Sequence, residues 1–232
     1  MGILILAVVT LPLLTALFLK VANRFLNELL TNFITINAAL LSVAVSFFMF
    51  GYLLLDKFKP IKFELFEWYP SPQIIFEFYL DGLSGVMMIL ISGLSLVIQL
   101  FSTSYMSKDE KYTKYFEYFN FFVFSMLLLV LSGNFLVMFF GWELVGLSSY
   151  LLISFWYEKN SAAKAGNKAF ILNRIGDFGF LIGLMMILNY FETFNFVNIF
   201  ESVLIKQPSN LDLIILFLLL GAFGKSAQFP LF

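Results

Sequence analysis

The stretch that decides the fold is Tyr118–Tyr157, which reads YFNFFVFSMLLLVLSGNFLVMFFGWELVGLSSYLLISFWY. Its 40 residues contain a single charged side chain, that of Glu143. As one helix the stretch would be about 60 Å long, whereas the hydrocarbon core of a bilayer is about 30 Å thick. The stretch therefore predicts two membrane crossings, with the turn at Ser132–Asn134.

Similar uncharged runs occur along the rest of the chain and predict an all-α polytopic membrane protein with about seven transmembrane helices. The expected spans are Gly2–Leu19, Phe33–Leu55, Gly82–Tyr105, Tyr115–Leu131, Phe135–Trp156, Gly166–Tyr190 and a seventh that starts near Asp212. Residues 61–80 alternate apolar and polar side chains around a turn at Tyr69–Pro72, which predicts a small β-hairpin at the membrane surface. Residues 195–206 have the pattern of a short amphipathic helix on the interface.

Composition supports this class and excludes several functions. The chain is 61% hydrophobic and 12% charged, about half the charged fraction of a soluble domain. It has no cysteine and no histidine, which leaves proton transfer to Lys, Glu, Asp and water. The net charge of −1 argues against a nucleic-acid partner.

Basic residues are unevenly divided between the two sides that the spans define. One side receives eight, namely Lys20, Arg24, Lys108, Lys111, Lys114, Lys159, Lys164 and Lys168. The other receives four, namely Lys57, Lys59, Lys62 and Lys206. The positive-inside rule places the first side in the cytoplasm or matrix, so the N-terminus and the hairpin are expected on the outer side.

Two ionisable residues are expected near the middle of the membrane, Glu143 in the fifth span and Lys225 in the seventh. Charges at that depth are costly and usually functional, although a static ion pair or a lysine that reaches the interface would be alternatives. Pro230 removes a hydrogen bond to the carbonyl of Ser226, which predicts a helix broken near Lys225. A carboxylate beside a lysine holds a proton on it, and moving that charge releases the proton.

The sixth span carries the remaining candidates. Arg174 and Asp177 are three residues apart, so they share a helix face and can pair. Because arginine stays protonated, this pair is expected to act as a fixed electrostatic element. Lys168, one turn inside Lys164, is a weaker candidate for feeding protons inward. The predicted proton path therefore contains Glu143, Lys225, Asp177, Arg174 and Lys168.

Several motifs resemble those of NADH-ubiquinone oxidoreductase chain 5, the distal antiporter-like subunit of respiratory complex I. The sequence FFGWELVGLSSYLLI at Phe139–Ile153 is similar to the fifth-helix motif of that family. NRIGD at Asn173–Asp177 and GKSAQFPL at Gly224–Leu231 are similar to its sixth helix and its broken seventh helix. LDGLS at Leu80–Ser84 and SYM at Ser104–Met106 also occupy the family's positions.

The resemblance implies a proton-translocating subunit in which Glu143 pairs with Lys225, while Asp177 and Arg174 take the adjacent places. It implies no redox chemistry and no cofactor in this chain, with NADH, FMN, Fe–S clusters and quinone on partner subunits of the enzyme complex. It also implies one membrane domain at 1–232, with three spans and the hairpin at 1–113 and an incomplete helical repeat at 114–232. The expected location is the mitochondrial inner membrane or, alternatively, a bacterial plasma membrane.

Family members continue well beyond the last residue of this sequence. We therefore expect a complementary C-terminal chain-5 polypeptide beside Phe232, as in a split mitochondrial subunit, together with other membrane-arm subunits and lipids. Two rival functions stay open. One is the large subunit of a multi-subunit cation/proton antiporter, and the other is a purely structural piece of the membrane arm.

Overall fold

The computed structural model describes residues 1–70, 73–206 and 210–231. Two predictions fall partly outside these residues. Ser71 and Pro72 belong to the expected hairpin turn, and Phe232 is the residue beside which the complementary polypeptide is expected.

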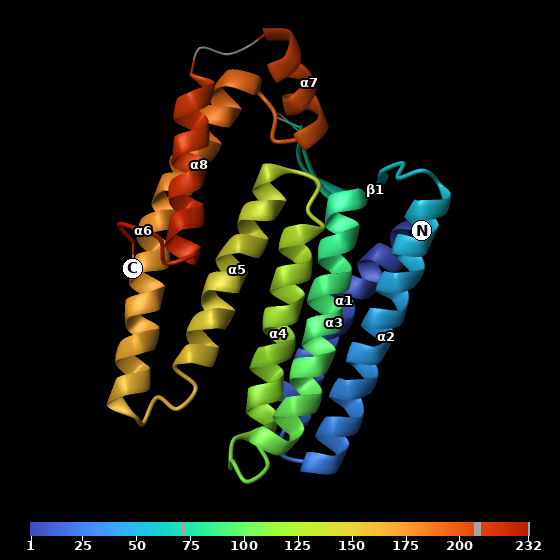
Figure 1. Cartoon of the computed structure of the whole chain (residues 1–232), viewed down its shortest axis with the longest axis vertical. Coiled ribbons are helices and arrows are strands. Elements are labelled where there is room, and N and C mark those ends of the chain that lie inside the picture. The colour runs from blue at the N-terminus through green and yellow to red at the C-terminus, as the bar shows by residue number, and fades with distance from the viewer. Residues whose placement is uncertain (71–72, 207–209, 232) are drawn as a thin grey trace. The chain divides into compact units, whose positions relative to one another are not determined.

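Eight helices and two strands form within the described residues. In chain order they are α1 (Gly2–Ala22), α2 (Glu28–Leu55), β1 (Ile61–Pro70), β2 (Gln73–Leu80), α3 (Gly82–Tyr105), α4 (Tyr112–Val130), α5 (Phe135–Ile153), α6 (Asn160–Phe191), α7 (Phe196–Lys206) and α8 (Leu211–Lys225) (Figure 1). Every expected span coincides with a helix, and β1 and β2 pair as the small two-stranded sheet. The short amphipathic helix is α7.

Five of these helices, α1, α2, α3, α5 and α6, are long and apolar enough to cross a membrane. The protein is therefore a membrane protein with several apolar spans. The other two expected spans, α4 and α8, are not among these five. The first two turns of α4 contain the charged residues Lys114 and Glu117, and α8 is only 15 residues long. The total of seven crossings stays a prediction.

Local hydrogen bonds explain where two of the helices begin. Asp81 caps α3, since its carboxylate accepts from the backbone N–H of Ser84 at 2.8 Å and the Ser84 hydroxyl accepts from the backbone N–H of Asp81. Asn134 caps α5 in the same way by accepting from the N–H of Val137 at 2.8 Å. Such caps satisfy donors that the first helical turn leaves free.

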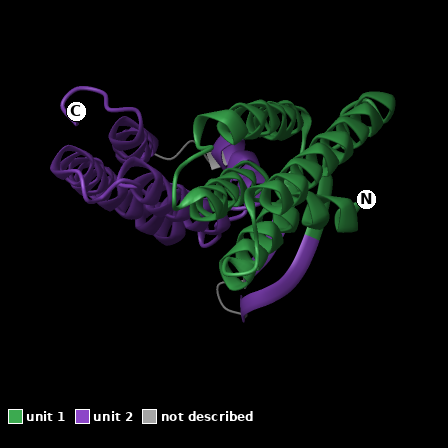
Figure 2. Cartoon of the chain, turned by 90° about the horizontal axis from the view of Figure 1, so that it is seen from below, with its two compact units in different colours: residues 1–63, 78–132 green, residues 64–77, 133–232 purple. Residues whose placement is uncertain are grey.

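Contacts within the chain group it into two compact units, coloured separately in Figure 2. Unit 1 contains Met1–Phe63 and Phe78–Ser132, and unit 2 contains Glu64–Glu77 and Gly133–Phe232. This grouping differs from the expected division at residue 113, which rests on a family repeat and stays a prediction.

Unit 1 packs α1 against α4 and α2 against α3. Its interior contains many small uncharged polar side chains. Most of their hydroxyls bond to the preceding turn of their own helix, as Thr35 does to the carbonyl of Thr31 at 2.9 Å and Ser46 to that of Ser42 at 2.7 Å. These groups are satisfied without a partner on another helix.

Unit 2 contains the closest helix packing, between α6 and α8, which run side by side (Figure 1). A Cβ atom added to Gly176 would lie 3.0 Å from the Cα of Gly224 and 3.1 Å from the carbonyl oxygen of Leu220. Glycine is needed there because the two backbones touch. Asp177 and Lys225 directly follow these two glycines, so the same contact brings them together.

The helix α8 ends at Lys225, where the sequence predicts a break. The N–H of Ser226 still bonds to the carbonyl of Ala222 at 3.1 Å, and Ala227 then adopts a left-handed backbone with φ of 49°. Pro230 cannot continue the helix. Lys225 thus occupies the last helical position of α8.

Candidate functional site

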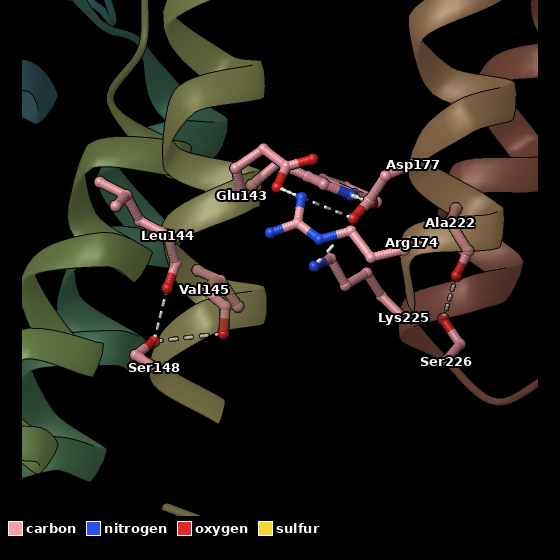
Figure 3. Close-up of polar contacts among 10 residues, drawn as sticks. Glu143, Leu144, Val145, Ser148, Arg174, Asp177, Ala222, Lys225 and Ser226 are labelled. Carbon is pink, nitrogen blue, oxygen red and sulfur yellow. Dashed lines mark hydrogen bonds and ion pairs between the residues drawn. The ribbon is translucent and has the colours of Figure 1, made fainter. Parts of the chain in front are cut away.

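Four ionisable side chains from three helices of unit 2 converge on one place. Glu143 comes from α5, Arg174 and Asp177 from α6, and Lys225 from the end of α8 (Figure 3). Two acids and two bases thus face one another among apolar helices.

Glu143 forms an ion pair with Arg174, through Oε2 and Nη1. The two side chains are 21% and 43% exposed. The guanidinium of Arg174 also lies over the ring of Phe170, 4.8 Å from its centroid. Arginine stays charged under all relevant conditions and prefers planar partners, so a charge-assisted contact joins α6 to α5 here.

Asp177 is the most buried member of the group, with 3% of its surface exposed. Its Oδ1 accepts a hydrogen bond from the indole nitrogen of Trp142 at 2.7 Å. The ammonium of Lys225 lies 4.0 Å from the same oxygen, and Nη1 of Arg174 lies 3.9 Å from Oδ2. One carboxylate is therefore shared between two cations.

The ammonium of Lys225 is buried and has no hydrogen-bond partner among the residues that the structure describes. It lies 5.7 Å from the centroid of the Trp142 ring. A Cβ atom on Gly146 would be only 2.6 Å from it, so the ammonium rests against the backbone of α5. A buried ammonium without a hydrogen bond is costly, so its charge depends strongly on the carboxylates nearby.

The partners differ from those predicted. The expected direct pair of Glu143 and Lys225 is absent from the ion pairs of the described residues; Glu143 is paired with Arg174, and Lys225 lies nearest to Asp177. The other expected pair, Arg174 with Asp177, is present, with Nη1 of Arg174 3.9 Å from Oδ2 of Asp177. The reason is geometric, because α6 packs directly on α8 and thereby brings Asp177 to Lys225.

Lys168 is also on α6, but it is exposed and takes part in none of the ion pairs of residues 1–70, 73–206 and 210–231. Its role in proton entry stays a prediction. Conversely, one residue at the site, Trp142, is assigned no role from the sequence. The available signal is its place one residue before Glu143.

Two family descriptions match the chain. Residues 132–232 match "NADH:quinone oxidoreductase/Mrp antiporter, TM", and residues 68–116 match "NADH-Ubiquinone oxidoreductase (complex I), chain 5 N-terminus". NADH-ubiquinone oxidoreductase chain 5 of Metridium senile is 37% identical over 226 residues, which cover 97% of this chain and 38% of that protein.

The chain belongs to the complex I chain 5 family. NADH-quinone oxidoreductase subunit L of Mycobacterium tuberculosis, another relative, is 40% identical over 175 residues, which cover 75% of this chain and 28% of that protein. The chain thus spans about a third of the length of the chain 5 and subunit L proteins that it matches.

Two solved assemblies contain chains with the same fold. The archaeal membrane-bound sulfane sulfur reductase, a respiratory membrane complex, gives a TM-score of 0.82 at 22% identity, over 100% of this chain and 46% of that one. The Mrp complex from Dietzia sp. gives 0.78 at 22% identity, over 96% of this chain and 24% of that one. The helical arrangement of the chain 5 family thus recurs in these assemblies.

Proposed function

We propose that the chain is a proton-translocating, antiporter-like subunit in the membrane arm of NADH:ubiquinone oxidoreductase. The observation that carries the proposal is the convergence of Glu143, Arg174, Asp177 and Lys225 from three helices. Ionisable groups within membrane spans are expensive and typically mark ion or proton pathways. Family membership supplies the enzyme complex in which such a pathway would work.

The geometry supports a transfer that depends on competition for Asp177. When Glu143 accepts a proton it becomes neutral, and its hold on Arg174 weakens. Arg174 can then close the 3.9 Å distance to Asp177 and neutralise the carboxylate that stabilises the charge on Lys225. Losing that stabilisation favours release of the lysine proton. A proton that enters at Glu143 thus leads to a proton leaving Lys225.

The reverse step needs no new contacts. Once Glu143 passes its proton to the neutral amine of Lys225, directly or through water, Arg174 returns to Glu143. Asp177 then again stabilises the charge on the lysine. Because the Lys225 ammonium has no close hydrogen bond to any residue that the structure describes, its charge responds to small changes in the neighbouring carboxylates. The sequence predicts no cofactor in this chain, so quinone reduction on partner subunits would drive the cycle.

The proposal includes the finer points of the sequence analysis. The chain would cross the inner mitochondrial membrane seven times, counting α4 and α8, or a bacterial plasma membrane in the alternative case. The distribution of basic residues supports an orientation with the N-terminus and the hairpin on the outer side. NADH, FMN, Fe–S clusters and quinone would bind partner subunits. The complementary C-terminal polypeptide also stays a prediction.

A second candidate function is a subunit of a multi-subunit cation/proton antiporter. It is favoured by the fold shared with the Mrp complex and by a family description that includes Mrp antiporters. The proteins that co-purify with the chain separate the two functions. Subunits with flavin and Fe–S clusters support complex I, whereas a set of small membrane subunits without redox cofactors supports the antiporter.

Replacing Glu143 with glutamine tests the proton-transfer role. We expect Glu143→Gln to lower the number of protons pumped per electron in the assembled complex reconstituted into liposomes, because glutamine cannot take up the proton. Glu201→Gln, at an exposed position of α7, is the matched control and should leave the ratio unchanged. Equal ratios for the two variants would favour the purely structural function.

A further inference from the structure

An apolar cluster separates the charged site from the far end of unit 2. On α6 it contains Phe180, Leu184 and Ile187, which follow Asp177 along one face and are at most 3% exposed. Phe139 and Trp142 of α5 pack against it. The ring of Phe180 stacks on that of Trp142 at a centroid distance of 5.1 Å and on that of Phe139 at 5.6 Å.

Beyond this cluster lies a polar cavity of about 250 Å³, where α6 ends and β2 passes. The polar residues that line it are Glu77, Asn134, Glu192, Thr193, Asn195 and Asn198. Glu77 is 4% exposed, and its Oε1 accepts a hydrogen bond from the side-chain amide of Asn195 at 2.5 Å. Its backbone carbonyl accepts from Gly133 at 2.9 Å. The carboxylate is thus held in a fixed place at the wall of a space large enough for water.

The two polar regions are far apart along α6. Asp177 and Glu192 are 15 positions apart in the sequence, which corresponds to about 22 Å along a helix axis. Protons do not cross an apolar region of that depth without a chain of water molecules, and a bare charge there would cost several kcal/mol. Hydrophobic constrictions of this kind open and close by wetting and drying. The packed cluster therefore closes this side of the charged site.

Trp142 connects the cluster with the charge of Asp177. Its indole ring stacks on the ring of Phe180, and its indole N–H donates a hydrogen bond to Asp177 at 2.7 Å. A hydrogen bond to an ionised carboxylate is stronger than one to its neutral form. Neutralising Asp177 therefore loosens Trp142, and with it the packing of the apolar cluster.

We propose that Trp142, Phe180 and Leu184 form a hydrophobic gate between Asp177 and the polar cavity around Glu77, and that Trp142 is the positioning residue which couples this gate to the charge of Asp177. The proposal rests on the proposed function. The cavity is the aqueous space to which the gate opens, and Glu77 is the fixed group that takes the proton there.

The gate is tested by passive proton leak through the assembled complex in liposomes, with an imposed pH gradient and no substrate. Phe180→Ala removes packing, and Leu184→Asn places a polar group of similar size in the cluster. We expect both to raise the leak several-fold over the unmodified complex. The matched controls on the same helix are Phe178→Ala and Leu181→Asn, at positions 68% and 36% exposed. Both should leak no more than the unmodified complex.

The subunit content of each preparation is also measured. A low proton leak from a variant that does not assemble is then not mistaken for a closed gate. If Phe180→Ala does not assemble, Leu184→Asn decides the result, since it keeps the number and branching of the side-chain heavy atoms. Leak in the assembled gate variants equal to that in their controls would overturn the proposal.

Trp142→Phe tests the coupling separately. It keeps an aromatic ring on Phe180 but removes the N–H that Asp177 accepts. We expect fewer protons pumped per electron with little added leak, whereas a merely structural role would lower assembly and leave that ratio unchanged. An unchanged ratio in Trp142→Phe while Glu143→Gln still lowers it would overturn the coupling and leave the proposed function intact.

Discussion

Units 1 and 2 both bury polar groups among apolar helices, but they do so by different means. In unit 1 the buried polar residues are serines, threonines and amides, and most bond to a carbonyl of their own helix. The charged residues that are buried within the described chain, Glu77 and Asp177, both belong to unit 2. There the partners come from other segments of the chain.

The difference shows how a membrane helix bundle separates stability from response. A hydroxyl bonded to its own helix is satisfied wherever the neighbouring helices lie. An ion pair between helices depends strongly on distance, and breaking it leaves an uncompensated charge in a low dielectric. Hydrogen bonding in unit 1 therefore tolerates shifts between its helices, while any shift of α5, α6 or α8 alters the electrostatics of unit 2.

The largest difference is expected from removing one buried polar group in each unit. Asp177→Asn leaves the buried ammonium of Lys225 without its carboxylate, which should destabilise the protein by about 3–5 kcal/mol. Asn120→Leu removes only an amide that donates to the carbonyl of Phe116 on its own helix, so it should cost about 1 kcal/mol. The retention of each variant chain in the complex during a thermal ramp compares the two substitutions. Similar losses of retention for both variants would remove the distinction between the units.

A glycine pair gives the next largest effect. Gly176→Ala places a methyl group 3.0 Å from the Cα of Gly224 and should separate α6 from α8, at a cost of about 1–3 kcal/mol. Gly51→Ala in α2 meets nothing within 4 Å, and should be neutral or stabilising by up to about 1 kcal/mol, because alanine favours helix. The same thermal ramp compares them. We expect Gly176→Ala to destabilise the protein and Gly51→Ala not to, and a neutral Gly176→Ala would contradict the close helix contact.

Gly146→Ala should affect function more than stability. The added methyl group would lie 2.6 Å from the Lys225 ammonium, which is the end of a flexible side chain and can withdraw. We expect a stability loss below about 1 kcal/mol together with fewer protons pumped per electron, because Lys225 is displaced from Asp177. Pumping at the unmodified level would indicate that the resting place of the ammonium is unimportant.

The smallest effect is expected from Ser46→Ala in unit 1. The lost hydroxyl bonds to the carbonyl of Ser42 in its own helix. Losing that bond is partly offset because alanine is a better helix former, so the stability change should be below about 1 kcal/mol. Pumping should not change. A clear loss of pumping in this variant would show that the polar interior of unit 1 takes part in proton transfer.

Much of the fold is predictable from sequence because bilayer thickness and helix rise fix the length of a span. The ends of α3 were matched to the residue by an uncharged run and the cap at Asp81, and the break after Lys225 was found from Pro230. The boundaries of α6 were less accurate. Its first turn carries exposed polar residues before Gly166, which hydropathy alone does not assign to the helix.

The members of the site were also identifiable, since charges in apolar runs are rare. Their pairing was not. Spacing along one helix predicts that Arg174 can meet Asp177, but which acid faces Lys225 depends on the contact of Gly176 with Gly224 across two helices. Trp142 was missed because its place beside Asp177 is set by the packing of α5 on α6, and sequence patterns do not record this.

The central claim is that the side chain of Lys225 takes up the transported proton as an amine and releases it as an ammonium. The most direct test is the number of protons pumped per electron by the assembled complex with Lys225→Met, a substitution that keeps the apolar stem and removes the charge. The control is Lys164→Met at the exposed start of α6. The account predicts a clearly lower ratio for Lys225→Met and an unchanged ratio for Lys164→Met. An unchanged ratio for a fully assembled Lys225→Met complex would contradict it.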